Sequence, residues 1–311
     1  MDGSRVAAVD RLAPCALRVR LGNVVTGAVR LVGRDTTCND LNAEGGGPAL
    51  ALAGSDVVVA TAWESTHHHP LLLGPAPRHR LRVVVEGEDA DHDLGTFVGS
   101  VVGSGARRVY ATWGYSWEPE GCDPVDETMA CTLGAPVGEV RAFPSQRVLA
   151  RLSGALLPVQ MEGDRIALAA PDGAARVLGL DGVVRADVPA ARARSVAVVG
   201  DRLVTLRRGS PTLDVWDAAT GAAITSIPLA RGATGRLDAA RVHGDAWVAY
   251  RTGASVRAVR LADARSVIVA RTPAGRQVTD VQLESPGIAW TTARGPARAP
   301  RATVLRFARL P

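Results

Sequence analysis

Short runs of β-branched and other apolar residues follow one another along the chain, and turns centred on glycine separate them. The run 195–199 is followed by Gly200 and a second run, 202–207, and the same phrase occurs at 49–53, Gly54 and 56–60. Runs of this length between turn residues predict strands joined as hairpins. No long stretch has the 3.6-residue spacing of an amphipathic helix. The pattern therefore predicts an all-β protein.

This pattern of two apolar runs joined by a glycine turn recurs along the chain at intervals of 37 to 58 residues. Its turning glycines are Gly54, Gly105, Gly163, Gly200, Gly244 and Gly287. Four-stranded propeller blades repeat every ~40–45 residues, so the later intervals match one blade and the earlier ones a blade with an inserted loop. The repeat at 195–228 shows all four strands, at 195–199, 202–207, 212–217 and 222–228, with a tight turn from Asp217 to Gly221.

Residues 213–221, Leu-Asp-Val-Trp-Asp-Ala-Ala-Thr-Gly, resemble the end of a blade in WD40-like and quinoprotein-like β-propellers. The Trp-Asp dipeptide occurs once, and the Gly-His pair of true WD40 repeats is missing, so the resemblance is to the propeller superfold. The layout also resembles uncharacterised propeller-like proteins of GC-rich bacteria. A superfold hosts many activities, so the resemblance implies a fold and leaves the function open.

We expect residues 1–311 to form a single domain, a seven-bladed β-propeller of four-stranded antiparallel blades. The first and last blades are incomplete, because the chain opens on a second-position strand and closes on a third-position strand, 303–310. The two missing strands would lie upstream of Met1, which predicts that the natural gene starts earlier. The alternative is six blades, with 279–284 closing against the first repeat.

Four cysteines allow three pairings. The expected strands place Cys15 and Cys38 in connections on one face of the first repeat, and Cys122 and Cys131 in one long loop of the third. We therefore expect the disulfides Cys15–Cys38 and Cys122–Cys131; the alternative is four free thiols. Disulfides indicate an extracytoplasmic protein, secreted or periplasmic. Residues 1–15 lack the apolar core of a signal peptide, so an export signal would have been lost with the upstream strands.

The charge balance does not predict a nucleic-acid partner. The net charge is +5, and all 36 basic residues are arginine, a usage typical of GC-rich coding. The arginines are scattered along the strands and aromatic residues make up only 4%, whereas nucleic-acid surfaces cluster cations among stacking aromatics. No apolar run approaches the ~18 residues of a membrane span, so none is expected.

Inserted residues between 34 and 48, 86 and 96, and 114 and 136 are expected to rise from one face of the first three repeats. Long loops on a rigid scaffold often carry binding function, although loops also tolerate insertion without function. Beside the last insertion, Trp113, Tyr115 and Trp117 alternate with other residues. Exposed, they would form a platform for a sugar or protein; buried, they would be ordinary packing.

The second repeat carries candidate metal ligands. His67 and His69 would share one face at the start of a third strand, and an acidic stretch, 86–93, is expected to form the following loop. The candidate residues are His67, His69 and His92 for a divalent metal and Asp89 and Asp91 for ligand binding. The alternative is a solvated acidic loop. No other cofactor is expected.

The leading interpretation is a monomeric, non-enzymatic module that binds a protein or a glycan. The sequence lacks G-x-S-x-G, Walker and H-E-x-x-H motifs, so we name no catalytic residue. The first strands, which line a propeller's channel, carry the polar exceptions Gln160, His243 and Glu284, too few and too dissimilar to define an active site. The alternative is a propeller-type hydrolase or lyase, with or without a metal.

Thiol titration of the denatured, unreduced native protein tests the predicted compartment. We expect no free thiol, because both cysteine pairs would be oxidised outside the cytosol. Four free thiols would contradict both the disulfides and the extracytoplasmic location.

Overall fold

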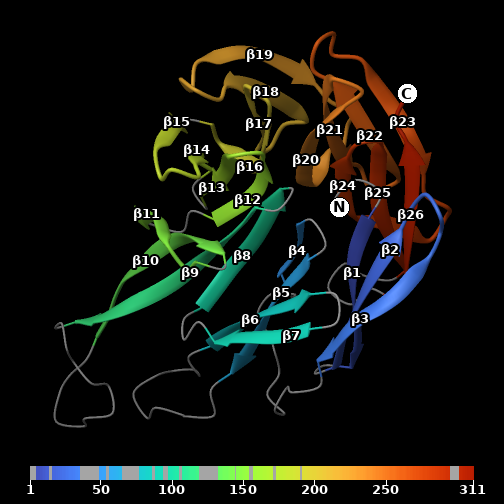
Figure 1. Ribbon diagram of the computed structural model, residues 1–311. Helices are drawn as coiled ribbons and strands as arrows, with labels where there is room; N and C mark the ends of the chain where they lie inside the picture. Colours follow the sequence, from blue (N-terminus) through green and yellow to red (C-terminus); the bar gives the residue numbers. More distant parts are fainter. Residues whose placement is uncertain are drawn as a thin grey trace. The chain divides into compact units, whose positions relative to one another are not determined.

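Strands and turns make up every described part of the chain (Figure 1). The computed structural model describes residues 5–13, 16–35, 49–53, 56–64, 77–85, 88–93, 97–104, 107–118, 132–143, 145–153, 157–170, 173–189, 191–294 and 301–311. These residues contain no helix, which confirms the all-β prediction.

Consecutive strands pair into antiparallel sheets, each in simple up-and-down order. The first sheet contains β1 (Arg5–Ala13), β2 (Ala16–Asn23) and β3 (Val29–Asp35). The second contains β4 (Ala49–Ala53), β5 (Asp56–Glu64), β6 (Pro77–Val85) and β7 (Glu88–Asp93). The third contains β8 (Phe97–Ser104), β9 (Arg107–Glu118), β10 (Thr132–Phe143) and β11 (Val148–Ser153). Repeated four-stranded antiparallel sheets are the blades of a β-propeller, and this is the fold of the chain.

Four more sheets follow in the second half. The fourth sheet contains β12 (Leu157–Glu162), β13 (Arg165–Ala169), β14 (Ala175–Gly179) and β15 (Val184–Val188), and the fifth contains β16 (Ala193–Val199), β17 (Arg202–Arg207), β18 (Thr212–Asp217) and β19 (Ala223–Pro228). The sixth contains β20 (Thr234–Val242), β21 (Asp245–Arg251), β22 (Ser255–Arg260) and β23 (Ser266–Arg271). The last contains β24 (Arg276–Glu284), β25 (Gly287–Arg294) and β26 (Arg301–Arg309). The strands β16 to β19 confirm the four strands expected for 195–228. The number of blades and the single domain stay predictions.

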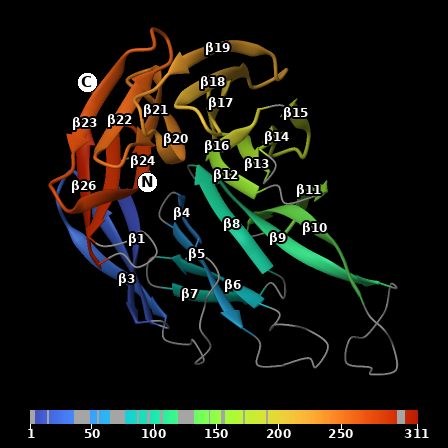
Figure 2. The same cartoon turned by 180° about the vertical axis from the view of Figure 1, so that it is seen from behind.

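The chain divides into two compact units. Unit 1 comprises Met1–Val6, Asn23–Gly27 and Val159–Pro311, and unit 2 comprises Ala7–Gly22 and Ala28–Pro158. In unit 1, Figures 1 and 2 show the first strands β16, β20 and β24 side by side, while the fourth strands β19 and β23 lie away from them.

The core of unit 1 lies between successive sheets. Between the sheets β16–β19 and β20–β23, Leu206, Leu213, Leu237, Val248 and Tyr250 are at most 1% exposed. Burial from both faces explains why the first strands read as nearly continuous apolar runs, as in β16. The outermost strands bury much less, and β19 exposes all but one of its residues.

The outermost strands have features that discourage pairing with another chain. Each of the following outermost strands shifts its register against the strand beside it by one residue, which marks a bulge: β3, β11, β15, β19 and β23. Bulges twist an exposed edge away from a flat pairing geometry. β7 pairs regularly with β6, and this edge instead carries acidic residues. Each edge is therefore protected by one of two devices.

The second sheet corrects the expected position of the acidic stretch. Residues 88–93 form the outermost strand β7 and not a loop, and the third strand is β6. His67, expected to open that third strand, lies outside the described residues, between β5 and β6. An outermost strand has a solvated edge and accepts charged residues, so polarity alone did not distinguish it from a loop.

The third sheet corrects the length of an insertion. β9 extends to Glu118 and pairs with β10 from Thr132 onward, so only 119–131 separate the two strands. The expected insertion, 114–136, was therefore too long. The turn assigned to Gly287 is also shifted, because Ser285 and Pro286 form it and Gly287 already belongs to β25.

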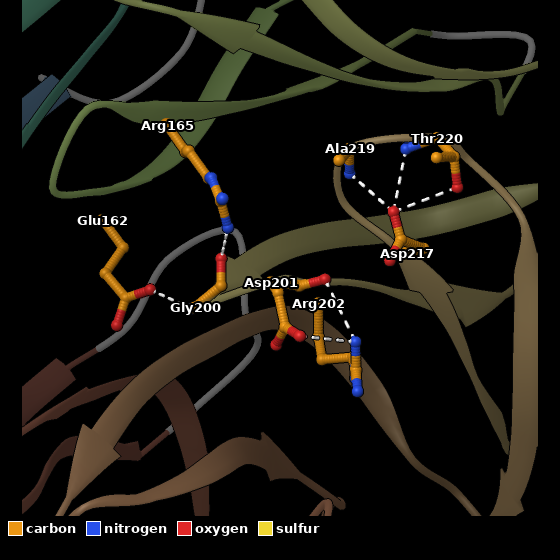
Figure 3. Close-up of polar contacts among 8 residues, drawn as sticks. All are labelled: Glu162, Arg165, Gly200, Asp201, Arg202, Asp217, Ala219 and Thr220. Atoms are coloured by element: carbon orange, nitrogen blue, oxygen red, sulfur yellow. Dashed lines mark hydrogen bonds and ion pairs between the residues drawn. The ribbon is translucent and has the colours of Figure 1, made fainter.

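The turn between β18 and β19 follows the chemistry expected from its sequence. Asp217 Oδ1 accepts hydrogen bonds from the backbone N–H of Ala219 and of Thr220, both at 2.9 Å, and from Thr220 Oγ1 at 3.0 Å (Figure 3). Gly221 closes the turn with φ = +73°, in the left-handed region that glycine adopts without strain. An aspartate at the start and a glycine at the end thus define the hairpin.

Replacing Gly221 by alanine tests how closely this turn packs on the neighbouring sheet. A Cβ at this position would lie 3.2 Å from Asp187 O and 3.3 Å from a methyl of Val188. We expect Gly221→Ala to lower the free energy of unfolding, measured in urea, by more than the ~1–2 kcal/mol of a left-handed alanine. Gly209→Ala is the control, because Gly209 has φ = +77° and open space around it. Equal losses in both variants would contradict the close approach.

Candidate functional site

The predicted metal and aromatic residues are only partly within the described structure. His67, His69, Cys15, Cys38, Cys122 and Cys131 lie outside the described residues. Asp89, Asp91 and His92 belong to β7. Among the described residues, no group of three or more His, Cys, Asp or Glu could hold a metal ion.

The three aromatic residues of the third repeat lie on one strand. Trp113, Tyr115 and Trp117 belong to β9. In the register they stand opposite Gly138, Pro136 and Leu133 of β10. Their role in ligand binding stays a prediction.

Gln160 connects three successive sheets of unit 1. From β12, its Oε1 accepts the backbone N–H of Val198 in β16 at 2.7 Å, and its Nε2 donates to Ala239 O in β20 at 2.9 Å. The side chain is 7% exposed. A buried amide with both ends bonded is a structural link between sheets. The link to β16 and β20 explains why a polar residue occurs at this position of a first strand.

The same kind of bond recurs in the next two sheets. Ser195 Oγ in β16 accepts the N–H of Leu237 in β20 at 2.7 Å. Asp238 Oδ2 in β20 accepts the N–H of Leu283 in β24 at 2.8 Å. Each first strand is an edge of its sheet, so its outward N–H groups have no strand partner and need other acceptors. Side chains of the preceding first strand provide them.

Equivalent positions supply these side chains. Ser195, Asp238 and Asp280 each lie four residues before the last residue of their strand, at β16, β20 and β24. The intervals of 43 and 42 residues match the repeat. Sequence reasoning missed these three residues; the signal that could have found them is the shared offset from the strand end.

Two carboxylates with perturbed protonation lie on neighbouring first strands. Burial raises the pKa of Asp238, against the opposing charge of Arg236, and the charge of Asp280 raises it further. Burial likewise raises the pKa of Asp280, against Arg236, the N–H of Val281 and Arg251. Arg251 also donates to Val278 O of β24 at 2.6 Å. Asp238 and Asp280 of the first strands interact with each other and with the charge of Arg236, and Asp280 also with that of Arg251; these two carboxylates are our candidate functional site.

At the opposite end of the first strands, charged side chains are used in stacking. Glu162, the last residue of β12, accepts the N–H of Gly200, and Arg165 of β13 donates to the carbonyl of the same glycine (Figure 3). Burial raises the pKa of Glu162, while the N–H of Gly200 and the charges of Arg241 and Arg165 lower it. His243 lies in the turn after β20, is exposed, and has φ = +52°. Neither residue joins a catalytic arrangement with a second reactive group.

Comparison with known proteins defines the fold and no family. No protein-family model matches the chain, and no curated protein matches it. Among solved structures, the uncomplexed acylaminoacyl peptidase of Pyrococcus horikoshii superposes with a TM-score of 0.57 at 10% identity, over 99% of this chain and 50% of that one. The chain therefore spans about half the length of that peptidase.

Two further structures have comparable scores. The C-terminal WD40 domain of Sif2 superposes with a TM-score of 0.51 at 12% identity, over 95% of this chain and 77% of that one. A prolyl endopeptidase superposes with a TM-score of 0.50 at 13% identity, over 94% and 46%. Identities this low show the β-propeller fold alone. Within the described residues, there is also no helix that could cross a membrane.

The pH dependence of stability tests the environment of Asp280. Its folded-state pKa is raised by burial, so its contribution to stability is complete below the pKa of an unfolded aspartate, about 3.9. That contribution is lost as the pH rises through the folded pKa. We therefore expect Asp280→Asn to raise the urea midpoint at pH 7, and to lose this advantage below about pH 4.

Asp217→Asn is the control of opposite sign. The N–H of Ala219, the hydroxyl and N–H of Thr220 hold the pKa of Asp217 below its ordinary value, so its stabilisation is present at neutral pH and lost on acidification. This variant should have a lower midpoint at pH 7. A lower midpoint for Asp280→Asn at pH 7 would contradict the burial argument.

Proposed function

We propose that this chain is a non-enzymatic β-propeller interaction module, extracytoplasmic, that binds a protein or a glycan through its connecting loops. The observation that supports it is the use of Gln160, Ser195 and Asp238: each bonds backbone of the next sheets. An active site on a propeller axis needs side chains there that can reach a substrate. In this chain Gln160, Ser195 and Asp238 on the first strands bond the neighbouring sheets instead.

The connections that leave the first three sheets supply the binding loops in this proposal. Residues 65–76 take the place of the expected insertion between 86 and 96, because 88–93 form the strand β7. Residues 36–48, 65–76 and 119–131 connect described strands of the first three sheets, after β3, β5 and β9. By chain direction, each segment leaves its own sheet at the end where second strands finish and third strands begin. Loops at one end of rigid sheets are the usual carriers of recognition. The cysteines within or near these segments support the extracytoplasmic part of the proposal.

A propeller-type hydrolase or lyase is the second candidate, and one observation favours it. Burial raises the pKa of both Asp238 and Asp280, and a carboxylic acid with a raised pKa can act as a general acid. No described histidine, cysteine or metal-binding group accompanies them. We therefore favour the module.

Substitution of the stacking side chains separates the two candidates. Gln160→Leu should lower the free energy of unfolding by about 3 kcal/mol, because it leaves the N–H of Val198 and the carbonyl of Ala239 without their partner. Ser195→Ala, which removes one such bond, should cost less. Both variants should still cross-link to the partner that the full chain captures from its host envelope.

The enzyme alternative makes the contrary prediction. It requires turnover of a peptide, ester or glycoside substrate by the full chain, and loss of that turnover in Asp280→Asn without loss of stability. Such a result would overturn the proposed function.

A further inference from the structure

Arginines occupy one end of three consecutive sheets in unit 1. The second strand of each sheet ends on an arginine: Arg207 in β17, Arg251 in β21 and Arg294 in β25. The register pairs these residues with the starts of the first strands, at Ala193, Thr234 and Arg276. Short connections join each fourth strand to the next first strand at this same end. These three arginines, which are far apart in the sequence, therefore lie at the same end of their sheets.

Further exposed arginines lie beside them. We call the whole set the arginine end; its members are Arg194, Arg207, Arg231, Arg251, Arg271 and Arg294. Arg194 lies at the start of β16, Arg231 in the connection to β20, and Arg271 at the end of β23 opposite Ser255. Five of the six belong to the first two of these sheets or the connection between them, and Arg294 belongs to the third.

The other end of the same sheets is electrically balanced. There Arg202 pairs with Asp201 at 2.8 Å (Figure 3), and Arg260 pairs with Asp245 at 3.1 Å and with Asp263 at 2.5 Å. A coding bias towards arginine acts on the whole chain, so it does not explain why the two ends of these sheets differ in charge. The positive charge is placed by the fold.

Like charges approach one another at the arginine end. Burial lowers the pKa of Arg251, the charge of Asp280 opposes this, and the charge of Arg194 lowers the pKa further. In the last sheet, Arg276 of β24 stands directly opposite Arg294 of β25, and like charges so placed destabilise a sheet. A surface of this kind attracts anions.

We propose that the arginine end binds an extended, acidic segment of a partner polypeptide, with a carboxylate at about every third residue. This inference rests on the proposed interaction function and names its partner. Packed sheets lie about 10 Å apart. An extended chain in the polyproline II conformation has three residues per turn and rises about 3.1 Å per residue, so every third side chain faces the same side, about 9 Å from the last. Carboxylates three residues apart therefore match arginines carried by successive sheets.

The protein already contains the recognition geometry. Arg207 donates from Nε and NH2 to the two carboxylate oxygens of Asp214, at 2.9 and 2.5 Å. Arg207 is itself engaged by Asp214, and its fork shows the geometry that another exposed guanidinium can offer to a carboxylate of an incoming chain. The remaining exposed members are Arg194, Arg231, Arg271 and Arg294.

The aromatic residues argue against a single-stranded nucleic acid as the occupant. Binding of that class uses exposed aromatic rings on which bases stack. In the described part of unit 1, Trp247, Tyr250 and Trp290 are 2%, 0% and 7% exposed, and the indole of Trp216 donates to Thr205 Oγ1. The surface offers charge without a stacking platform, which favours carboxylates.

Fluorescence anisotropy with the full chain tests the proposal. The probe is a labelled peptide with aspartate at every third position and Gly and Ser between; a second peptide has the same aspartates clustered. The variant Arg194→Gln/Arg231→Gln/Arg294→Gln removes three charges from the arginine end. The matched control, Arg185→Gln/Arg202→Gln/Arg265→Gln, removes three charges from the other end. Urea midpoints confirm that both variants fold.

We expect the first triple variant to bind the spaced peptide about tenfold more weakly and the control to stay within about twofold, since exposed ion pairs contribute modestly and add. Binding should weaken with salt, and the clustered peptide should bind less tightly. Equal losses in the two triple variants, or tighter binding of an oligonucleotide or a uronic-acid glycan of equal charge, would overturn the proposal.

These outcomes are distinct from failure of the proposed function. If the partner captured from the envelope binds the first triple variant normally, the acidic-segment inference is wrong and the interaction function stands. Turnover that Asp280→Asn abolishes would instead remove the interaction function itself.

Discussion

The first strand of each sheet in unit 1 has a free edge, and the backbone groups along that edge need hydrogen-bond partners. Gln160, Ser195 and Asp238 meet this need by reaching from one first strand to the next, at bonds of 2.7 to 2.9 Å. Because an unpaired buried N–H group is costly, these bonds set how successive sheets stack. These three polar residues of the first strands are therefore engaged before any ligand arrives.

This commitment leaves the ends of the sheets as the places where recognition can develop. At one end, turns such as Asp217–Gly221 and paired charges such as Arg202 and Asp201 satisfy one another locally. At the other end, burial and the charge of Arg194 both lower the pKa of Arg251. A fold tolerates such repulsion at modest cost when the side chains are solvated, and the resulting potential is available for an acidic partner.

Sequence reasoning succeeded where local chemistry decides the structure. The strands β16 to β19 and the Asp217–Gly221 turn needed only short apolar runs bounded by turn residues and a glycine with positive φ. It failed at β7, where acidic residues on a protected edge resembled a loop. It also treated the arginines as scattered, because positions such as Arg207, Arg251 and Arg294 are more than forty residues apart in the chain.

The order of strands, the repeat that produces a β-propeller and the tight turns follow from the amino-acid sequence by itself, because each depends on residues within one hairpin. The tertiary structure alone decided which distant residues meet: Gln160 with Val198 and Ala239, and the arginines of successive sheets at one end. The reason is physical. Stacking of sheets depends on burial and hydrogen bonds between repeats, and these contacts have no signature within a single repeat.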